Sequence, residues 1–162
     1  DENLSRIAQE VLILQRNAHH EITYHLDLPD HGPMVRCDRR LISQALINLL
    51  QNAADAIAMA PRQAAPSEQG GVSGGEVWVR IAQEAENIAI VVADNGVGLP
   101  KDDRNRLTEP YVTHKAKGTG LGLAIVKKIM EDHGGTVRLE DRAGERGTVA
   151  TLVLPVKDDH GA

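Results

Sequence analysis

Residues 87–98, NIAIVVADNGVG, decide how this sequence is expected to fold. The first part of the stretch is nearly all apolar, which is typical of a strand in the middle of a sheet. It ends at Asp94, a carboxylate that needs a hydrogen-bond donor if the strand end is buried. Gly96 and Gly98 remove side chains where a flat ring could approach the backbone or where the chain needs a positive φ. Because Asp-Asn-Gly is also ordinary turn chemistry, a binding loop and a plain turn both remain open.

The spacing of apolar residues predicts three helices and five strands along the chain. Helices are expected over 3–18, from a cap at Asp38 towards Pro61, and from the glycines at 118–122 to Gly134, with strands over 22–28, 76–82, 87–93, 136–140 and 148–156. The buried stripe of the first helix is predicted to be Leu4, Ile7, Val11 and Leu14. This order predicts an α+β, two-layer sandwich with the helices on one face of a mixed, mostly antiparallel sheet.

Composition narrows the classes of protein that are possible. The chain has 162 residues, 2% aromatic residues, no Phe and a net charge of -5, which argues against a nucleic-acid-binding surface. A lone Cys37 excludes an internal disulfide framework and suits a reducing compartment, so we expect a cytoplasmic domain. We expect one domain over 1–156, with a flexible loop at 61–75 and a disordered tail at 157–162. No apolar run approaches the length of a membrane span, although a longer parent could be anchored in the inner membrane.

Three polar side chains fall on one ridge of the second predicted helix. At 100° per residue, Asn48, Asn52 and Asp55 lie within about 60° of one another, beside the apolar stripe. Amide and carboxylate oxygens are hard ligands that suit Mg²⁺, which commonly bridges to substrate phosphates. A solvated helix face would show the same residues, so this ridge needs support from elsewhere.

A second glycine cluster could supply a phosphate site. Gly118, Gly120 and Gly122 open a helix, so backbone N–H groups and the positive end of the helix dipole could face an anion. The preceding segment, 99–117, has five Lys or Arg against three Asp or Glu, a local charge of +2 that suits a basic lid. A flexible solvated loop is the alternative. There is no Walker-type P-loop, and the cluster does not follow a strand as in a Rossmann unit.

Five motifs in order carry a resemblance to a known family: NLLQNAADA (48–56), DNGVG (94–98), EPYVTHK (109–115), GTGLGL (118–123) and GTVATLVLP (147–155). Over residues 1–156 the sequence resembles the catalytic and ATP-binding domain of bacterial sensor histidine kinases, whose superfamily includes DNA gyrase, heat-shock chaperones and MutL. The sequence of residues 107–135 is most similar to that of the NtrY-type kinases of nitrogen regulation. The resemblance implies a Bergerat-type ATP-binding fold with ATP and Mg²⁺ as cofactors.

The resemblance also implies roles for particular residues. Asn52 would be the Mg²⁺ ligand with Asn48 near it, and Asp94 would accept the adenine amino hydrogen, partly through a water shared with Thr151. The phosphates and lid would involve Tyr111, Thr113, His114, Lys115, Lys117, Gly118, Thr119, Gly120, Leu121, Gly122 and Leu123. Two positions depart from the family pattern: Asp55 stands where a basic residue is common, and Ala56 where an aromatic residue is common.

The resemblance points to phosphoryl transfer and not to hydrolysis. Hydrolysing members carry a Glu at the position of Asn48, and an amide cannot act as a general base. His20 precedes Glu21-Ile22 but lies beside a predicted strand, so we reject it as the phosphoacceptor. The expected partners are upstream dimerisation and phosphoacceptor helices and a response-regulator receiver domain, with this chain a monomer that contacts neither membrane nor nucleic acid. The alternative is a stand-alone regulator of the anti-sigma serine-kinase type or a degenerate partner-binding module.

Overall fold

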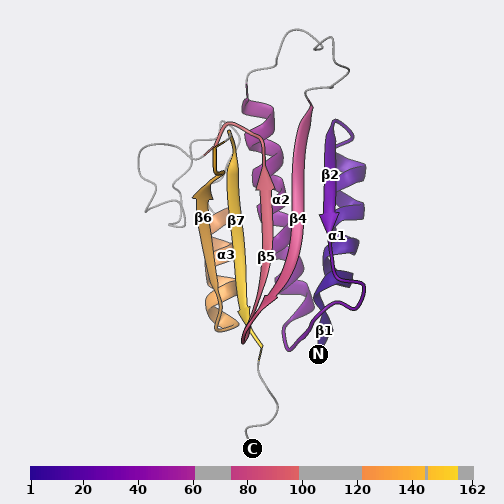
Figure 1. Ribbon diagram of the computed structural model, residues 1–162, viewed down its shortest axis with the longest axis vertical. Helices are drawn as coiled ribbons and strands as arrows, with labels where there is room; N and C mark the ends of the chain where they lie inside the picture. Colours follow the sequence, from indigo (N-terminus) through magenta and orange to yellow (C-terminus); the bar gives the residue numbers. More distant parts are fainter. Residues whose placement is uncertain (61–73, 99–121, 145, 157–162) are drawn as a thin grey trace, which may run out of the picture.

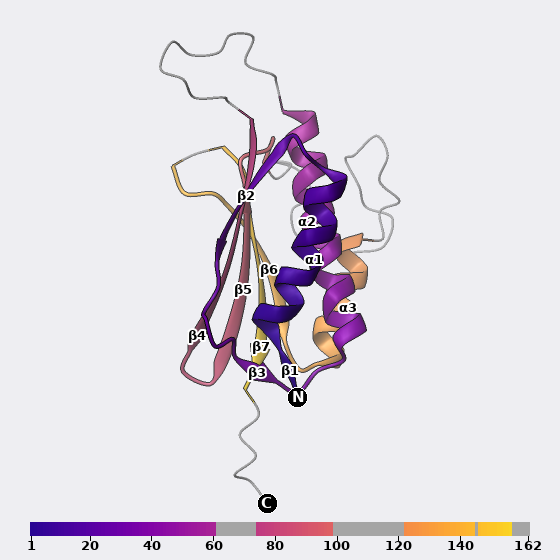
Figure 2. The same cartoon turned by 90° about the vertical axis from the view of Figure 1, so that its right-hand side faces the viewer.

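The computed structural model describes residues 1–60, 74–98, 122–144 and 146–156, which form two layers (Figure 1). Helices α1, α2 and α3 all cover the same face of a sheet, as Figure 2 shows from the side. The helices are α1 (Leu4–Ala18), α2 (Arg39–Met59) and α3 (Gly122–Asp132), and the main strands are β2 (Ile22–Asp27), β4 (Gly75–Glu84), β5 (Asn87–Asp94), β6 (Thr136–Asp141) and β7 (Thr148–Pro155). The predicted α+β sandwich is confirmed. The predicted lid at 99–117 and tail at 157–162 lie outside the described residues, as does the predicted loop at 61–75 except for its last two residues, of which Gly75 is the first residue of β4.

The five-stranded sheet has the order β2-β4-β5-β7-β6. β2 runs parallel to β4, and every other neighbouring pair is antiparallel, which gives the predicted mixed, mostly antiparallel sheet. β5 lies at the centre, where Ile90 pairs with Ile81 of β4 and Leu152 of β7. Ile88, Ile90 and Val92 of this apolar run are buried beneath the helices, and the alternate residues Ala89, Val91 and Ala93 are half-buried on the other face.

Two short strands were not predicted. β1 (Glu2–Asn3) and β3 (Met34–Val35) pair antiparallel as a separate two-stranded sheet, with Glu2 opposite Val35. A two-residue strand is too short to show an alternating pattern, so its sequence carries no periodic signal. The pair brings the start of the chain to the segment that leads into α2, and Leu4 N–H donates to the Pro33 carbonyl at 3.1 Å.

The helices begin where short polar side chains cap them. Asp38 caps α2 as predicted, and its carboxylate accepts the backbone N–H groups of Arg40 and Leu41. The side chain of Asn3 caps α1 by accepting from Arg6 N–H at 3.1 Å. Both side chains satisfy N–H groups that have no partner inside the first turn of a helix.

The core between the layers is almost wholly aliphatic, as the scarcity of aromatic residues requires. One prediction about it was wrong: Leu14 is 60% exposed, whereas Leu12 is 1% exposed and Gln15 is 7% exposed. At about 100° per residue, the buried residues lie between Ile7, about 60° to one side of Leu4, and Ser5, about 100° to the other side, while Leu14 lies about 80° from Leu4 beyond Ile7 and outside this arc. Within the described ranges, no helix is both long and apolar enough to cross a membrane.

Candidate functional site

The carboxylate of Asp94 is buried at the end of β5. The residue is 5% exposed, and its Oδ1 accepts the backbone N–H of Gly96 at 2.8 Å. Asp94 is opposite Val77, which is fully buried, so its side chain points toward the helix layer. Burying a charged group is costly unless donors satisfy it, so this placement marks the strand end as a polar site enclosed by apolar residues.

The neighbouring Asn95 has a structural role that the sequence analysis missed. Its Oδ1 accepts from Glu76 N–H at 2.8 Å, and its Nδ2 donates to the Gly74 carbonyl at 3.2 Å. The backbone N–H of Asn95 also donates to the Glu76 carbonyl at 3.3 Å. These three bonds fix the end of β5 to the start of β4, and they hold Asp94 in one position.

The chain after Asp94 passes very close to α2. Val97 N–H donates to the Ala56 carbonyl at 2.9 Å, and a Cβ added to Gly96 would collide with the backbone of Ala56. Gly98 has φ +90°, the positive value that was one of the two expected reasons for a glycine there. Ala56, one of the two departures from the family pattern, is therefore part of the close approach between α2 and Gly96.

The polar ridge of α2 faces the start of α3. Asn48 Nδ2 donates to the Gly122 carbonyl at 3.3 Å, and Asn48 Oδ1 accepts from Gln44 Nε2 at 2.7 Å. A Cβ placed on Gly122 would lie 3.9 Å from Asn52 Oδ1. Asp55, one turn further along, accepts from Gln51 Nε2 at 3.0 Å. Asn48, Asn52 and Asp55 are all half-buried, so this ridge is not the fully solvated face of the alternative interpretation.

Apart from Thr151, the predicted residues that the structure describes come from three segments, which α2 links through the Ala56 carbonyl and through Asn48. They are the end of β5, the second half of α2 and the first turn of α3, where Leu123 packs against the core. The remaining predicted residues lie outside the described part of the chain: Tyr111, Thr113, His114, Lys115, Lys117, Gly118, Thr119, Gly120 and Leu121.

The predicted pairing of Thr151 with Asp94 was wrong. Thr151 lies opposite Val91, one residue out of phase with the buried pair Val92 and Ala150. Alternate residues of a strand point to opposite faces, so Thr151 belongs to the open face of the sheet and Asp94 to the helix face. Although Thr151 is 7% exposed, its burial comes from that other face.

The hydroxyl on the correct face is Thr148. Continuing the β5–β7 register by one pair places it opposite Asp94. The preceding Gly147 confirms the proximity, because it has φ +132° and a Cβ there would collide with the Asp94 carbonyl oxygen. The β6–β7 turn thus closes one side of the site, and Thr148 could not be chosen from the sequence alone because the β5–β7 register decides which hydroxyl lies opposite Asp94.

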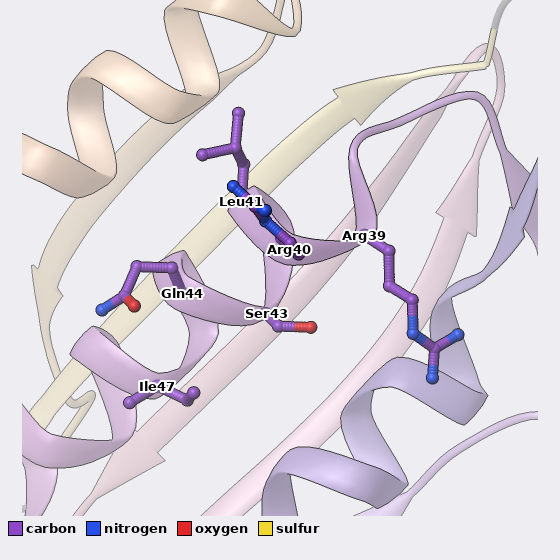
Figure 3. A pocket seen from close by; sticks show the side chains of 6 residues that line it. All are labelled: Arg39, Arg40, Leu41, Ser43, Gln44 and Ile47. Carbon is purple, nitrogen blue, oxygen red and sulfur yellow. The ribbon is translucent and has the colours of Figure 1, made fainter.

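A cavity of about 440 Å³ opens elsewhere, on the first half of α2 (Figure 3). It is lined by Arg39, Arg40, Leu41, Ser43, Gln44 and Ile47. In Figure 3, Arg39 points toward α1, and its guanidinium lies 3.2 Å from the Glu2 carboxylate. None of the predicted site residues lines this cavity.

Comparisons with known proteins agree with this geometry. Residues 37–158 match the family described as histidine kinase-, DNA gyrase B-, and HSP90-like ATPase. The chain is 45% identical over 153 residues to the nitrogen regulation protein NtrY of Azorhizobium caulinodans, covering 94% of this chain and 19% of that protein. It is 35% identical to the sensor histidine kinase ZraS of Escherichia coli, covering 93% of this chain and 30% of that protein. The chain thus spans less than a third of the length of these two relatives.

Solved structures show the same architecture. A mycobacterial sensor histidine kinase, MprB, matches with a TM-score of 0.78 and 28% identity over 95% of this chain and 96% of that one. The catalytic domain of the histidine kinase ThkA matches with a TM-score of 0.77 and 30% identity over 95% of this chain and 93% of that one. With the buried Asp94, the ridge of α2 and this fold in place, the chain belongs to the family of histidine kinase-, DNA gyrase B- and HSP90-like ATPases.

Proposed function

We propose that this chain binds Mg-ATP and is the part of a sensor histidine kinase that donates the γ-phosphoryl group to a histidine on a separate dimerisation and phosphoacceptor domain. The observation that carries the proposal is the buried Asp94 carboxylate, held by Gly96 N–H at 2.8 Å beside a backbone stretch that has no room for a side chain. A buried carboxylate that accepts hydrogen bonds suits a ligand that carries an amino group.

The donor set of α2 fits a magnesium ion bound with phosphates. Asn52 and Asn48 offer amide oxygens, and Asp55 offers a carboxylate on the same ridge. When bound, ATP would supply the phosphoryl group and Mg²⁺ would neutralise its charge. In this proposal Asn52 is the protein ligand of the metal, Asp94 orients the adenine, and Thr148 replaces Thr151 as the hydroxyl near that carboxylate. The first turn of α3 holds the phosphates together with the glycines at 118–122.

Transfer to a histidine is favoured over hydrolysis by the chemistry of Asn48. Its amide donates to the Gly122 carbonyl and accepts from Gln44, and an amide cannot take a proton from water. The nucleophile is then an imidazole from outside this chain, and positioning and charge neutralisation govern the in-line transfer. His20, rejected above, lies in the turn between α1 and β2.

The partners follow from the same proposal. ThkA has been solved in complex with a response regulator protein, TrrA, and the ThkA chain of that complex matches this chain with a TM-score of 0.74. We infer that the parent protein is an NtrY-type sensor kinase that has phosphoacceptor helices upstream and passes its phosphoryl group to a receiver domain. The domain itself works in the cytoplasm as a monomer, whether or not the parent is anchored in the inner membrane.

Calorimetry with a non-hydrolysable ATP analogue, with and without Mg²⁺, tests the nucleotide site. We expect Mg-dependent binding by the wild type, a loss of about tenfold to a hundredfold in Asp94→Asn, and a loss of the Mg²⁺ dependence in Asn52→Ala. Asp27→Asn, which alters an exposed carboxylate of β2, is the matched control and should bind like the wild type. Absence of Mg-dependent binding by the wild type would favour the degenerate partner-binding module.

Labelled ATP tests the reaction. The chain alone should acquire no acid-labile label, and a separately supplied dimerisation and phosphoacceptor domain should become labelled on histidine. Label on a serine of a partner would instead support the anti-sigma type of kinase.

A further inference from the structure

Two polar links join α2 to α3, one near each end of α3. Near its start, Asn48 Nδ2 donates to the Gly122 carbonyl at 3.3 Å. At its other end, the backbone N–H of Asp38 donates to Nε2 of His133 at 3.0 Å. The two helices therefore run antiparallel, and the links lie roughly 16 Å apart for a helix of 11 residues.

Both ring nitrogens of His133 are used. A backbone amide can only donate, so Nε2 must be the unprotonated nitrogen that accepts from Asp38. Nδ1 lies 2.7 Å from the Ile129 carbonyl, an acceptor, and must carry the proton. The contacts thus assign the neutral Nδ1–H tautomer, in which the ring joins the last turn of α3 to the cap of α2.

We propose that His133 is a positioning residue for the nucleotide site. This inference rests on the proposed function. Asp38 caps α2 through its side chain, and its backbone N–H holds His133, so the ring sets how far α3 lies along α2. That axial position determines where Gly122 meets Asn48 and Asn52 at the other end. His133 acts at a distance, through the rigid rod of α3, and does not touch nucleotide.

Three substitutions of His133 distinguish the effects of its two hydrogen bonds, to the Asp38 N–H and to the Ile129 carbonyl. His133→Gln can place a carbonyl oxygen near the position of Nε2 and keep an acceptor for Asp38 N–H. His133→Asn keeps a donor near the position of Nδ1 but is too short to reach Asp38. His133→Ala removes both groups. Ile81→Val, a buried β4 residue outside the α2–α3 contact, is the control for a comparable loss of stability.

The experiment measures the affinity of residues 1–162 for the non-hydrolysable ATP analogue with Mg²⁺ at 10 °C, where circular dichroism confirms folding. We expect about fivefold weaker binding in His133→Ala and His133→Asn, and binding within about twofold of the wild type in His133→Gln and Ile81→Val. Hydrogen exchange of the Asp38 amide supplies a readout without nucleotide. It should be slow in the wild type and His133→Gln and fast in the other two His133 variants. If His133→Ala fails to fold, His133→Asn against His133→Gln carries the same test.

The failures are distinguishable. If the wild type binds nucleotide and all three His133 variants bind equally well, the inference is wrong and the proposed function stands. Equal weakening in Ile81→Val would show a general effect of stability, which also overturns the inference. If the wild type binds no nucleotide, both the proposed function and the inference about His133 are wrong. A rapidly exchanging Asp38 amide in the wild type would contradict the contact itself.

Discussion

The two sides of the helix layer differ in how completely their buried polar groups are hydrogen-bonded, although Ser5 on the α1 side does donate to the Pro29 carbonyl at 3.3 Å. On the side of α1 and β2, Gln15 and Tyr24 are each 7% exposed. The Gln15 Oε1 atom and the Tyr24 hydroxyl have no hydrogen-bond partner among the described residues. On the side of α2, α3 and β5, the buried or half-buried Asp94, Asn95 and Asn48 all make hydrogen bonds to backbone groups. Every predicted site residue that the structure describes, apart from Thr151, lies on this second side.

This difference indicates where polar side chains must be held in fixed positions by hydrogen bonds. A buried polar atom without a partner costs about 1–3 kcal/mol, a cost that aliphatic burial can offset where only packing matters. Side chains that must present a carboxylate or an amide in one position need fixed partners instead. We therefore regard the α1–β2 side as support and the α2–α3 side as the working part, and the predictions below test that division.

The largest expected effect is on stability alone. Leu12→Ala removes a side chain of α1 that is 1% exposed, and should lower the free energy of unfolding by about 3 kcal/mol because it leaves a cavity. Urea unfolding measures the loss. Nucleotide affinity of the folded variant at 10 °C should equal that of the wild type, and a parallel loss of affinity would contradict the division into two sides.

An alanine at position 147 should affect both stability and binding. Gly147→Ala combines a φ of +132° with a collision against the Asp94 carbonyl oxygen, so we expect a loss of about 2 kcal/mol and about tenfold weaker nucleotide binding. Gly144→Ala is the matched control in the same turn. It has φ +68° and open space around its Cβ, so it should lose about 1 kcal/mol and bind normally. Thermal unfolding measures the loss of stability, and calorimetry measures nucleotide affinity. Equal nucleotide affinity in the two variants would contradict the contact at Asp94.

Removing an unsatisfied group should cost almost nothing. Tyr24→Phe deletes a buried hydroxyl that has no partner in the described structure, so the free energy of unfolding should stay the same or rise by up to about 1 kcal/mol. Gln15→Met tests the same idea on α1. A loss of more than about 1 kcal/mol in Tyr24→Phe would mean that the hydroxyl is hydrogen-bonded after all, for example to an ordered water.

The smallest effect is a pH dependence at the start of α2. Burial, and then the Glu2 carboxylate, raise the pKa of the Cys37 thiol. The unfolded chain then loses this proton at lower pH than the folded chain, so the thiol's contribution to stability is complete below about pH 8.5 and is lost as the pH rises through the folded pKa. Unfolding free energies from pH 7.5 to 9.5 should fall less steeply in Cys37→Ser than in the wild type. Alkylation of Cys37 at pH 8 should also be slower than that of a free cysteine.

Much of the fold could be predicted because its signals are local. The apolar run before Asp94 and the cap at Asp38 each depend on residues within one turn or along one strand, and both predictions were confirmed. Leu14 and Thr151 were assigned to the wrong surroundings for different reasons. The arc of α1 that is buried depends on where β2 and α2 lie, and the face of Thr151 depends on a strand register that no short pattern encodes.

By itself, the sequence determined the class of fold and the family, because spacing along a chain is enough to specify local structure and an ordered set of motifs. Only the tertiary structure decided which hydroxyl faces Asp94, that Ala56 packs against Gly96, and that His133 bonds to Asp38. Those contacts join residues far apart in the chain, and they follow from strand register and helix packing, which the whole molecule sets at once.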